Sequence, residues 1–322
     1  MRYFVVILAI AIGVAGVVAA GIDDSPGGQL LSVLLIIGGC AGREDGLAQQ
    51  VVRIAVKSLS VQRMPRVRCV TWSKRARTTM TNFNGRPVLV TGASGGIGGA
   101  TVRHLVEAGA DVIASGRSNE AALEALAADT GARVLPFDLT SEESVRDALA
   151  GLDVWGVVNC AGYGGEIATP MDTDVTVFDR VININARGTL LVTKYTSRSM
   201  IRLGNGGSIV NVSSQASLVA LNGHISYGSS KAAVDNITRV SALELGKYNI
   251  RVNSVNPTVV MTPMSAWYWG REDIANPFLT AMPLGRWATE DEIAAPITFL
   301  LSDAASMITG VSLPIDGGYT CR

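Results

Sequence analysis

From residue 87 onward, short runs of β-branched and other apolar residues alternate with longer stretches in which apolar positions recur every three or four residues. The short runs have the length and composition of buried strands, and the longer stretches have the spacing of amphipathic helices. The predicted strands span residues 88–91, 111–114, 133–137, 154–159, 208–212 and 251–256, and the predicted helices span residues 98–107, 120–128 and 141–149.

This regular alternation of strand and helix predicts the fold class. Strands that are joined by helical crossovers run parallel, and the crossovers have one hand. A parallel sheet needs helices on both of its faces, because both faces are apolar. We therefore expect an α/β domain with a doubly wound parallel sheet over residues 84–322.

The N-terminal part of the chain has a different character. Residues 3–21 and 25–42 contain no charged residue, and a basic stretch follows at residues 43–83. The first apolar run is long enough to span a bilayer, the second is marginal, and together they could form a transmembrane hairpin. The basic stretch would then keep the downstream domain in the cytoplasm. We therefore expect an apolar segment at residues 1–42, a basic linker at residues 43–83 and the α/β domain after it.

Three other interpretations of this extension stay open. Residues 18–20 resemble a signal-peptide cleavage site, and Ile37–Cys40 resembles a lipoprotein box that lies far from the N-terminal Arg2. In the third interpretation Met80 is the true start of the protein. We favour this one, because residues 71–79 have no coherent pattern whereas the regular domain begins abruptly at residue 84.

Charge and cysteine content exclude some classes of function. The formal net charge is zero, but residues 1–79 carry ten basic and four acidic side chains, so the rest of the chain is acidic. An acidic domain gives no indication of nucleic-acid binding. The four cysteines and two histidines have neither paired nor metal-type spacing, so we expect no structural metal and no disulfide framework.

A glycine-rich loop, Thr91–Gly98, joins the first predicted strand to the first predicted helix. Backbone amides and the helix dipole at such a junction can hold a pyrophosphate, and glycine permits the close approach that this needs. A tight turn without a ligand is the alternative for such a loop taken alone. Its place in the strand and helix order favours a dinucleotide site.

The end of the second predicted strand indicates which dinucleotide would bind. A free ribose 2′-hydroxyl is usually held by an acidic residue at this point, but the chain reads Ser115–Ser118. Arg117 would instead bind a 2′-phosphate through charge-assisted hydrogen bonds. We therefore favour NADP(H) as the cofactor and keep NAD(H) as the alternative. If Arg117 has no function in binding, it is an ordinary solvated arginine on the surface.

The side chains of Tyr227, Lys231 and Ser214 predict the type of reaction. Tyr227 and Lys231 are four residues apart, on one face of a helix, and a nearby cation lowers the pKa of a phenol. Tyr227 could then supply a proton at neutral pH. Ser214 follows the predicted strand at residues 208–212 and would hold a substrate oxygen. These roles suit hydride transfer from a nicotinamide to a carbonyl carbon, with Lys231 also binding the ribose.

These motifs occur in an order that identifies a resemblance. Over residues 84–322 the chain resembles the short-chain dehydrogenase/reductase family, with Gly92, Gly96 and Gly98 at the family's three glycine positions and Ser214 thirteen residues before Tyr227. The resemblance implies a Rossmann-type sheet of about seven strands. It also implies a homotetramer that assembles through two long helices, here expected at residues 174–202 and 226–247.

The resemblance also assigns site residues. Asn185 matches the family's fourth catalytic position, Asp138 would meet the adenine, and Asn159 would order the central strand. Two positions depart from the family pattern: Cys160 replaces a second asparagine, and Gly95 replaces a basic residue of many NADP-dependent members. The predicted catalytic residues are Asn185, Ser214, Tyr227 and Lys231; the predicted cofactor-binding residues are Gly92, Ser94, Gly96, Ile97, Gly98, Arg117, Ser118, Asp138, Leu139, Asn159, Ala161, Gly162, Tyr227, Lys231, Pro257, Val260 and Thr262.

A narrower resemblance indicates the substrate. Thr258 stands where the family commonly has glycine, and residues 211–215, 242–246 and 256–262 resemble dicarbonyl/L-xylulose reductases and related carbonyl reductases. That resemblance implies a pocket for the substrate. We also expect residues 266–270, which contain three aromatic side chains, to form a lid over the cofactor, with simple packing of the aromatic rings as the alternative. The predicted substrate residues are Ser214, Gln215, Leu221, His224, Tyr227 and Trp269.

The expected function is therefore the NADPH-dependent reduction of a small polar ketone or α-dicarbonyl, of the L-xylulose type, by a cytoplasmic domain. A 3-oxoacyl thioester reductase or a polyol dehydrogenase of the same family is an alternative, although no basic entrance for a phosphopantetheine carrier is visible. An alternative of another class is a catalytically idle NADP sensor tethered to a membrane by residues 1–42. The presence of Ser214, Tyr227 and Lys231 argues against it.

Overall fold

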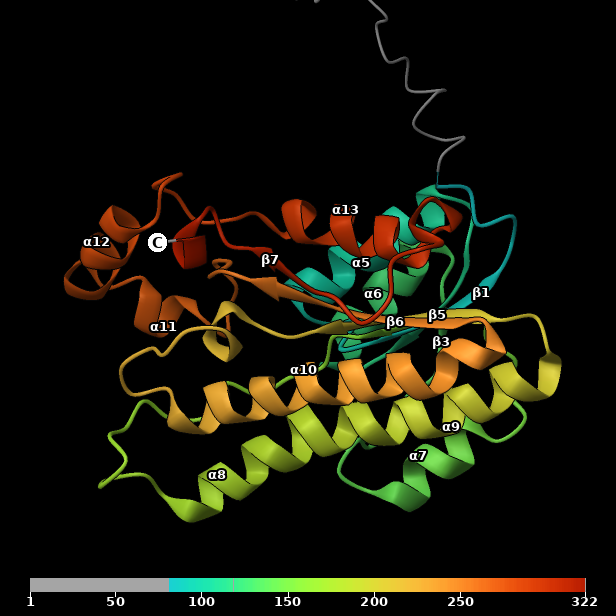
Figure 1. Cartoon of the computed structure of the whole chain (residues 1–322), viewed down its shortest axis with the longest axis horizontal. Coiled ribbons are helices and arrows are strands. Elements are labelled where there is room, and N and C mark those ends of the chain that lie inside the picture. The colour runs from blue at the N-terminus through green and yellow to red at the C-terminus, as the bar shows by residue number, and fades with distance from the viewer. Residues whose placement is uncertain (1–80, 118, 322) are drawn as a thin grey trace, which may run out of the picture. The chain divides into compact units, whose positions relative to one another are not determined.

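The computed structural model describes residues 81–117 and 119–321, in which a seven-stranded parallel sheet forms the core (Figure 1). The strand order is β3-β2-β1-β4-β5-β6-β7, so the winding reverses between β1 and β4. The predicted doubly wound sheet of about seven strands is confirmed. The strands are β1 (Pro87–Thr91), β2 (Asp111–Ser115), β3 (Arg133–Val134), β4 (Gly156–Asn159), β5 (Gly207–Val212), β6 (Ile250–Pro257) and β7 (Ser312–Ile315).

Helices cover both faces of this sheet (Figure 1). Helices α5, α6 and α13 lie on one face, and α7, α8, α9 and α10 lie on the other. Side chains of β1 divide between the two cores: Val88 and Val90 pack on the first face and Leu89 packs on the second, as the two-residue period of a strand requires. The helices are α5 (Gly96–Glu107), α6 (Glu120–Thr130), α7 (Glu142–Leu149), α8 (Val175–Ile182), α9 (Gly188–Leu203), α10 (Ile225–Leu245), α11 (Ala266–Trp269), α12 (Glu272–Ala281) and α13 (Glu290–Leu301).

Strand β3 and helix α5 differ from the predicted ranges in ways that concern the site. Strand β3 has two residues instead of five, because it is an exposed edge strand and the chain leaves the sheet after Leu135, whose N–H still donates to the carbonyl of Ala114. Helix α5 begins at Gly96, two residues earlier than predicted, since the glycine loop itself supplies the first turn. The first turn of α5 therefore belongs to the predicted phosphate site.

The long helix predicted at residues 174–202 is interrupted. A π-helical turn, Asn183–Arg187, separates α8 from α9, while the backbone continues in the same direction. A π turn contains one more residue than an α-helical turn, so it changes the direction in which its side chains point relative to a regular helix. Here that turn contains Asn185, which is fully buried. The second long helix, α10, is close to its predicted span.

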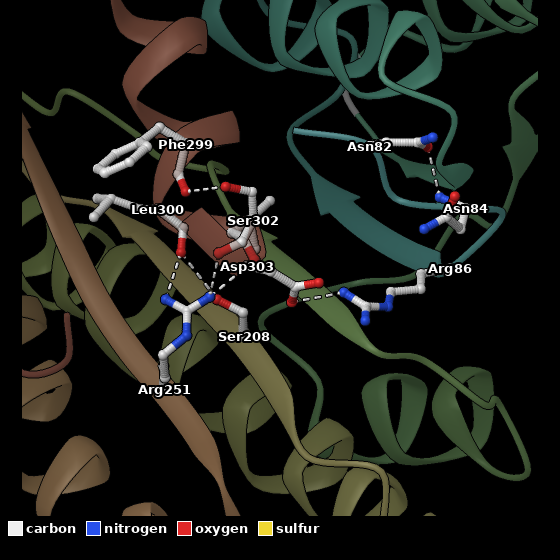
Figure 2. Close-up of polar contacts among 10 residues, drawn as sticks. Asn82, Asn84, Arg86, Ser208, Arg251, Phe299, Leu300, Ser302 and Asp303 are labelled. Atoms are coloured by element: carbon white, nitrogen blue, oxygen red, sulfur yellow. Dashed lines mark hydrogen bonds and ion pairs between the residues drawn. The ribbon is translucent and has the colours of Figure 1, made fainter. Parts of the chain in front are cut away.

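Arg251 holds the C-terminal end of α13 against the sheet (Figure 2). Its guanidinium donates hydrogen bonds to the main-chain oxygens of Leu300 (2.6 Å) and Leu301 (2.9 Å), which have no partner within the helix. A cation at this end also interacts favourably with the helix dipole. Asp303 follows, and it forms an ion pair with Arg86 at 2.9 Å, just before β1. Helix α13 is thus fixed at one end by β1 and β6.

The predicted membrane segment at residues 1–42 and most of the basic linker lie outside the described residues. Within residues 81–117 and 119–321, no helix combines the length and apolar character that a bilayer crossing needs. The same stretches contain no group of three or more histidine, cysteine, aspartate or glutamate side chains arranged to hold a metal ion.

Candidate active site

The four predicted catalytic residues come from three elements at the carboxyl-terminal edge of the sheet. Asn185 lies in the π turn, Ser214 follows β5, and Tyr227 and Lys231 lie on α10. Parallel strands place their carboxyl ends at one edge, which is where ligands bind in doubly wound sheets. The fold therefore brings together residues that are up to 46 positions apart in the sequence.

Asn185 connects a loop to α10. Its side-chain oxygen accepts a hydrogen bond from the N–H of Tyr163 (2.7 Å), and its amide donates to the carbonyl of Tyr163 (3.0 Å) and to the hydroxyl of Ser230 (2.9 Å). A Cβ atom added to Gly162 would lie 3.5 Å from both Asn185 Oδ1 and Lys231 Nζ. Asn185, Gly162 and Lys231 thus converge on one point, as the predicted site requires.

The Lys231 ammonium is directed at the sheet instead of the phenol. It donates to the carbonyl oxygen of Val212 at 2.8 Å and lies 5.6 Å from the centre of the Tyr227 ring. Burial lowers the pKa of Lys231 to about 8. Burial also raises the pKa of Tyr227 to about 12, against the opposing effect of a hydrogen bond with Ser214. The expected lowering of the Tyr227 pKa was therefore wrong, because burial raises this pKa by more than the hydrogen bond with Ser214 lowers it.

The glycine loop fits a dinucleotide. Gly92 has φ +66°, and a Cβ atom there would lie 2.7 Å from the Cα of Ala161. A Cβ atom on Gly98 would lie 2.1 Å from the carbonyl oxygen of Gly92. No side chain caps the start of α5, since Gly95 stands at the capping position. Its first N–H groups are therefore available to an anion such as pyrophosphate.

Arg117, predicted to bind the 2′-phosphate, and Asp138, predicted to meet the adenine, form an ion pair with each other. Burial by itself would raise the pKa of Asp138, but hydrogen bonds from the side chain and backbone of Thr140, together with Arg117, hold it below its usual value. A Cβ atom on Gly116 would lie 2.8 Å from the hydroxyl of Ser94, so the end of β2 touches the glycine loop. The residues predicted to bind the nucleotide at the ends of β1, β2 and β3 are thus neighbours.

The other predicted cofactor residues surround the same edge. The methyl group of Thr262 would lie 2.9 Å from a Cβ atom on Gly96. Pro257 ends β6, and Val260 is buried. Leu139 packs against Gly188, and Ile97 packs against the core on the first face of the sheet. The Asn159 amide donates to the side-chain oxygen of Asn211 at 2.8 Å, and Ser118 lies outside the described residues.

Sequence reasoning missed Glu290, the first residue of α13. Its carboxylate lies beside the glycine loop, because a Cβ atom on Gly96 would be 2.1 Å from Glu290 Oε1. The available signal was an acidic start to a helix, which usually indicates only a favourable interaction with that helix's own dipole. The reason that it reaches α5 is that α5 and α13 pack side by side on one face of the sheet, which the sequence does not show.

Gln215 is the most direct indication of a ligand. It follows Ser214 and is only 2% exposed, yet neither polar atom of its side-chain amide has a hydrogen-bond partner within the described part of the chain. Burying such a group without partners costs about 1–3 kcal/mol. A bound molecule with polar groups would recover that free energy.

His224 and Trp269 also meet, as predicted. Their ring centres are 5.6 Å apart, and Tyr268 lies 5.7 Å from His224. Burial lowers the pKa of His224, although its bond to a backbone carbonyl opposes this, so the ring is neutral at physiological pH. Because His224 Nδ1 donates to the carbonyl of Asn222 at 2.7 Å, Nε2 is left as an acceptor. Leu221 is bonded to this turn through its carbonyl, which accepts the N–H of His224.

The predicted lid is part of an aromatic cluster. Trp269 packs on Phe278 with ring centres 4.6 Å apart, and Phe278 stacks on Tyr319 at the same separation. Trp287 contacts both Trp269 and Phe278. This cluster joins α11, α12 and the C-terminal turn, so the position of Trp269 depends on contacts with residues outside its own helix.

Comparisons with known proteins identify the family of the chain. A family model described as enoyl-(acyl carrier protein) reductase matches residues 92–320. The L-xylulose reductase of Caenorhabditis elegans is 43% identical over 246 residues, which are 74% of this chain and 97% of that protein. The chain belongs to the short-chain dehydrogenase/reductase family. Carbonyl reductase [NADPH] 2 of Sus scrofa is 38% identical to this family member over 241 residues, 74% of this chain and 98% of that protein.

A solved structure supports the fold independently. The short-chain type dehydrogenase/reductase from Mycobacterium ulcerans has a TM-score of 0.70 and 36% identity, and the match covers 75% of this chain and 92% of that one. The predicted family is therefore confirmed, and the chain is an oxidoreductase. Members of this family bind NAD(P), which the glycine loop and the uncapped start of α5 fit.

The buried ammonium makes a testable contribution to stability. The ordinary pKa of a lysine, 10.5, falls to about 8 at Lys231, so the charged form is disfavoured in the folded protein. The resulting loss of stability is fully present below about pH 8 and declines as the pH rises toward 10.5, where the unfolded chain also loses its proton. Lys231→Met is therefore expected to increase the free energy of unfolding at pH 7 by on the order of 2 kcal/mol.

Urea denaturation at several pH values measures this effect. The gain should shrink toward zero near pH 10.5. Lys247→Met, at an exposed position, is the control and should show no such gain. A Lys231→Met protein that is less stable than the wild type at pH 7 would contradict the prediction.

Proposed function

We propose that this family member reduces a small polar ketone or α-dicarbonyl, of the L-xylulose type, with NADPH as the hydride donor. One observation carries the proposal: Asn185, Gly162 and Lys231 converge within contact distance, beside a glycine loop that fits a dinucleotide. The names of the relatives from Caenorhabditis elegans and Sus scrofa support the substrate class.

In this proposal Tyr227 is the proton donor. The dihydronicotinamide supplies the hydride when it is bound. Burial holds the pKa of Tyr227 at about 12, so the phenol keeps its proton at neutral pH and can give it to the oxygen of the substrate. The Ser214 hydroxyl would hold that oxygen, and Lys231 would bind the ribose and stabilise the negative charge that develops. Asn185 fixes the loop at Tyr163 and the start of α10 relative to each other.

Arg117 supports NADPH over NADH. Its side chain is 69% exposed, so the guanidinium is accessible to a 2′-phosphate while it also contacts Asp138. No acidic residue occurs between Asp111 and Glu120 to receive a free 2′-hydroxyl. The alternative, NAD(H), would leave Arg117 without a phosphate partner.

The pocket residues support a polar substrate. Gln215 offers an unpaired amide, and His224 offers its free Nε2 as an acceptor. Leu221 and Trp269 would supply the apolar wall. A molecule with a carbonyl and adjacent hydroxyl or oxo groups satisfies such a pocket better than a purely hydrocarbon one, because unpaired buried polar groups disfavour apolar ligands.

Replacement of Tyr227 tests the proposal. Tyr227→Phe removes the proton donor and keeps the ring, so kcat/KM for L-xylulose or diacetyl with NADPH should fall by at least about 100-fold. The affinity for NADPH, measured by its fluorescence, should stay within about twofold. Tyr195→Phe is the matched control, since the Tyr195 hydroxyl donates to Glu142 of α7, away from the proposed site. Undiminished carbonyl reduction by Tyr227→Phe would refute the mechanism.

Arg117→Ala tests the choice of cofactor. Loss of a charge-assisted contact to the 2′-phosphate should weaken NADPH binding by about 30-fold and leave NADH binding nearly unchanged. Arg133→Ala, which removes a surface arginine paired with Asp111, is the control. A wild-type protein that prefers NADH would refute the assignment.

We also propose that the protein is a homotetramer. Helix α9 exposes Leu190, and α10 exposes Val240 and Leu243, the last of which is 83% exposed. Apolar residues exposed along two adjacent long helices indicate a surface that another subunit covers. Light scattering should give four times the mass of one chain, and a monomer would contradict the proposal.

A further inference from the structure

A buried carboxylate lies beneath the site and has no part in the mechanism above. Asp235 is on α10, one helical turn beyond Lys231 and two turns beyond Tyr227, and it is 3% exposed. Burying a carboxylate is costly unless hydrogen bonds satisfy its oxygens. The hydrogen-bond donors around Asp235 therefore indicate which segments of the protein this carboxylate holds together.

Three donors converge on Asp235. The hydroxyl of Ser254 donates to Oδ1 at 2.8 Å, while the hydroxyl of Ser217 (2.5 Å) and the amide of Asn256 (2.8 Å) donate to Oδ2. Ser217 belongs to the short turn after Ser214, and the other two donors belong to β6. One carboxylate thus joins α10, β6 and the turn after β5.

Two of these donors lead to the main chain of Ser214. Its carbonyl oxygen lies 2.6 Å from the hydroxyl oxygen of Ser217, whose single hydrogen is shared between this carbonyl and Asp235, and 3.2 Å from the amide nitrogen of Asn256. An ionised carboxylate only accepts hydrogen bonds, so Asp235 fixes which way the Asn256 amide faces. One N–H of that amide then points to Asp235, and the other is shared between the hydroxyl oxygen of Ser217 (2.8 Å) and the carbonyl oxygen of Ser214 (3.2 Å). The third donor, Ser254, has no link to Ser214 among the hydrogen bonds of the described residues.

We propose that Asp235 is a positioning residue: through Ser217 and Asn256 it holds the main chain of Ser214 against α10, and so sets the distance between the Ser214 hydroxyl and the Tyr227 phenol. This inference rests on the proposed roles of Ser214 and Tyr227. It adds a residue that has no contact with the substrate or the dinucleotide. Small displacements of a reacting group lower the rate strongly, which is why such an anchor matters.

The charge of Asp235 also acts on Lys231. Burial is the main influence on the Lys231 ammonium and lowers its pKa, while Cys160 and Asp235 oppose this and raise it. The titratable groups facing Lys231 are Cys160 after β4 and Tyr227 and Asp235 on α10. Removing the Asp235 charge should therefore lower the pKa of Lys231 further. The rate would then decline at a lower pH on the basic side.

A matched pair of serine variants tests the positioning role. Ser217→Ala and Ser254→Ala each remove one hydroxyl that donates to Asp235, but only Ser217 connects it to Ser214. We expect Ser217→Ala to lower kcat by about tenfold with an unchanged affinity for NADPH, and Ser254→Ala to keep kcat within about twofold of the wild type. Equal kcat values for the two variants would overturn the proposal.

Asp235→Asn tests the charge in the full-length protein. We expect a kcat at least about tenfold lower, an NADPH affinity within about twofold, and a basic limb of the kcat/KM profile that moves to lower pH. Asp316→Asn, which removes another buried carboxylate whose partners are Gly318 and Thr320, is the control and should leave that limb in place. Wild-type kcat and an unmoved limb in a folded Asp235→Asn protein would overturn the proposal.

These outcomes can be separated from failure of the proposed function. Tyr227→Phe tests the chemistry itself and does not depend on Asp235. If Tyr227→Phe is inactive and the two serine variants behave alike, the mechanism stands and the anchor does not. If Asp235→Asn does not fold, the contrast between Ser217→Ala and Ser254→Ala alone decides.

Discussion

The packing of α10 against the carboxyl ends of β5 and β6 is the constraint on which the site depends. The Lys231 ammonium donates to the carbonyl of Val212 at 2.8 Å, and the hydroxyl of Ser213 donates to the carbonyl of Lys231 at 3.0 Å. One of these bonds is donated by α10 and the other by the segment after β5, so together they fix the helix to the end of the strand. As a result Tyr227, on the helix, and Ser214, after the strand, can face one substrate atom with little freedom to move apart.

This packing has an electrostatic cost that also shapes the chemistry. Burial shifts both ionisable groups toward their neutral forms, raising the pKa of Tyr227 to about 12 and lowering that of Lys231 to about 8. A protonated phenol suits a proton donor in a reduction, whereas a buried ammonium destabilises the fold. The hydrogen bond from Lys231 to the carbonyl of Val212 and the charge of the nearby Asp235 offset part of that destabilisation. Stability and function are thus in opposition at α10, as is common for active sites.

Local irregularities and a shared sheet edge complete the site. The π turn at residues 183–187 buries Asn185 where its amide reaches both Tyr163 and Ser230. Glycines in the loop after β1 allow the chain to approach Ala161 after β4. The reversal of strand order between β1 and β4 places these loops side by side, so that the proposed dinucleotide and substrate regions adjoin.

The sequence by itself determined the fold class and the glycine loop, and it predicted roles for Ser214, Tyr227 and Lys231, because strand and helix periodicity and motif spacing are local properties of the chain. It did not show the π turn at Asn185, the approach of Glu290 to Gly96, or the hydrogen bonds by which Asp235 holds Ser217 and Asn256 beside the Ser214 carbonyl. It also led to the wrong direction for the pKa of Tyr227. These features depend on burial and on contacts between distant segments, and only the packed tertiary structure decides which groups lose water and which neighbours they gain.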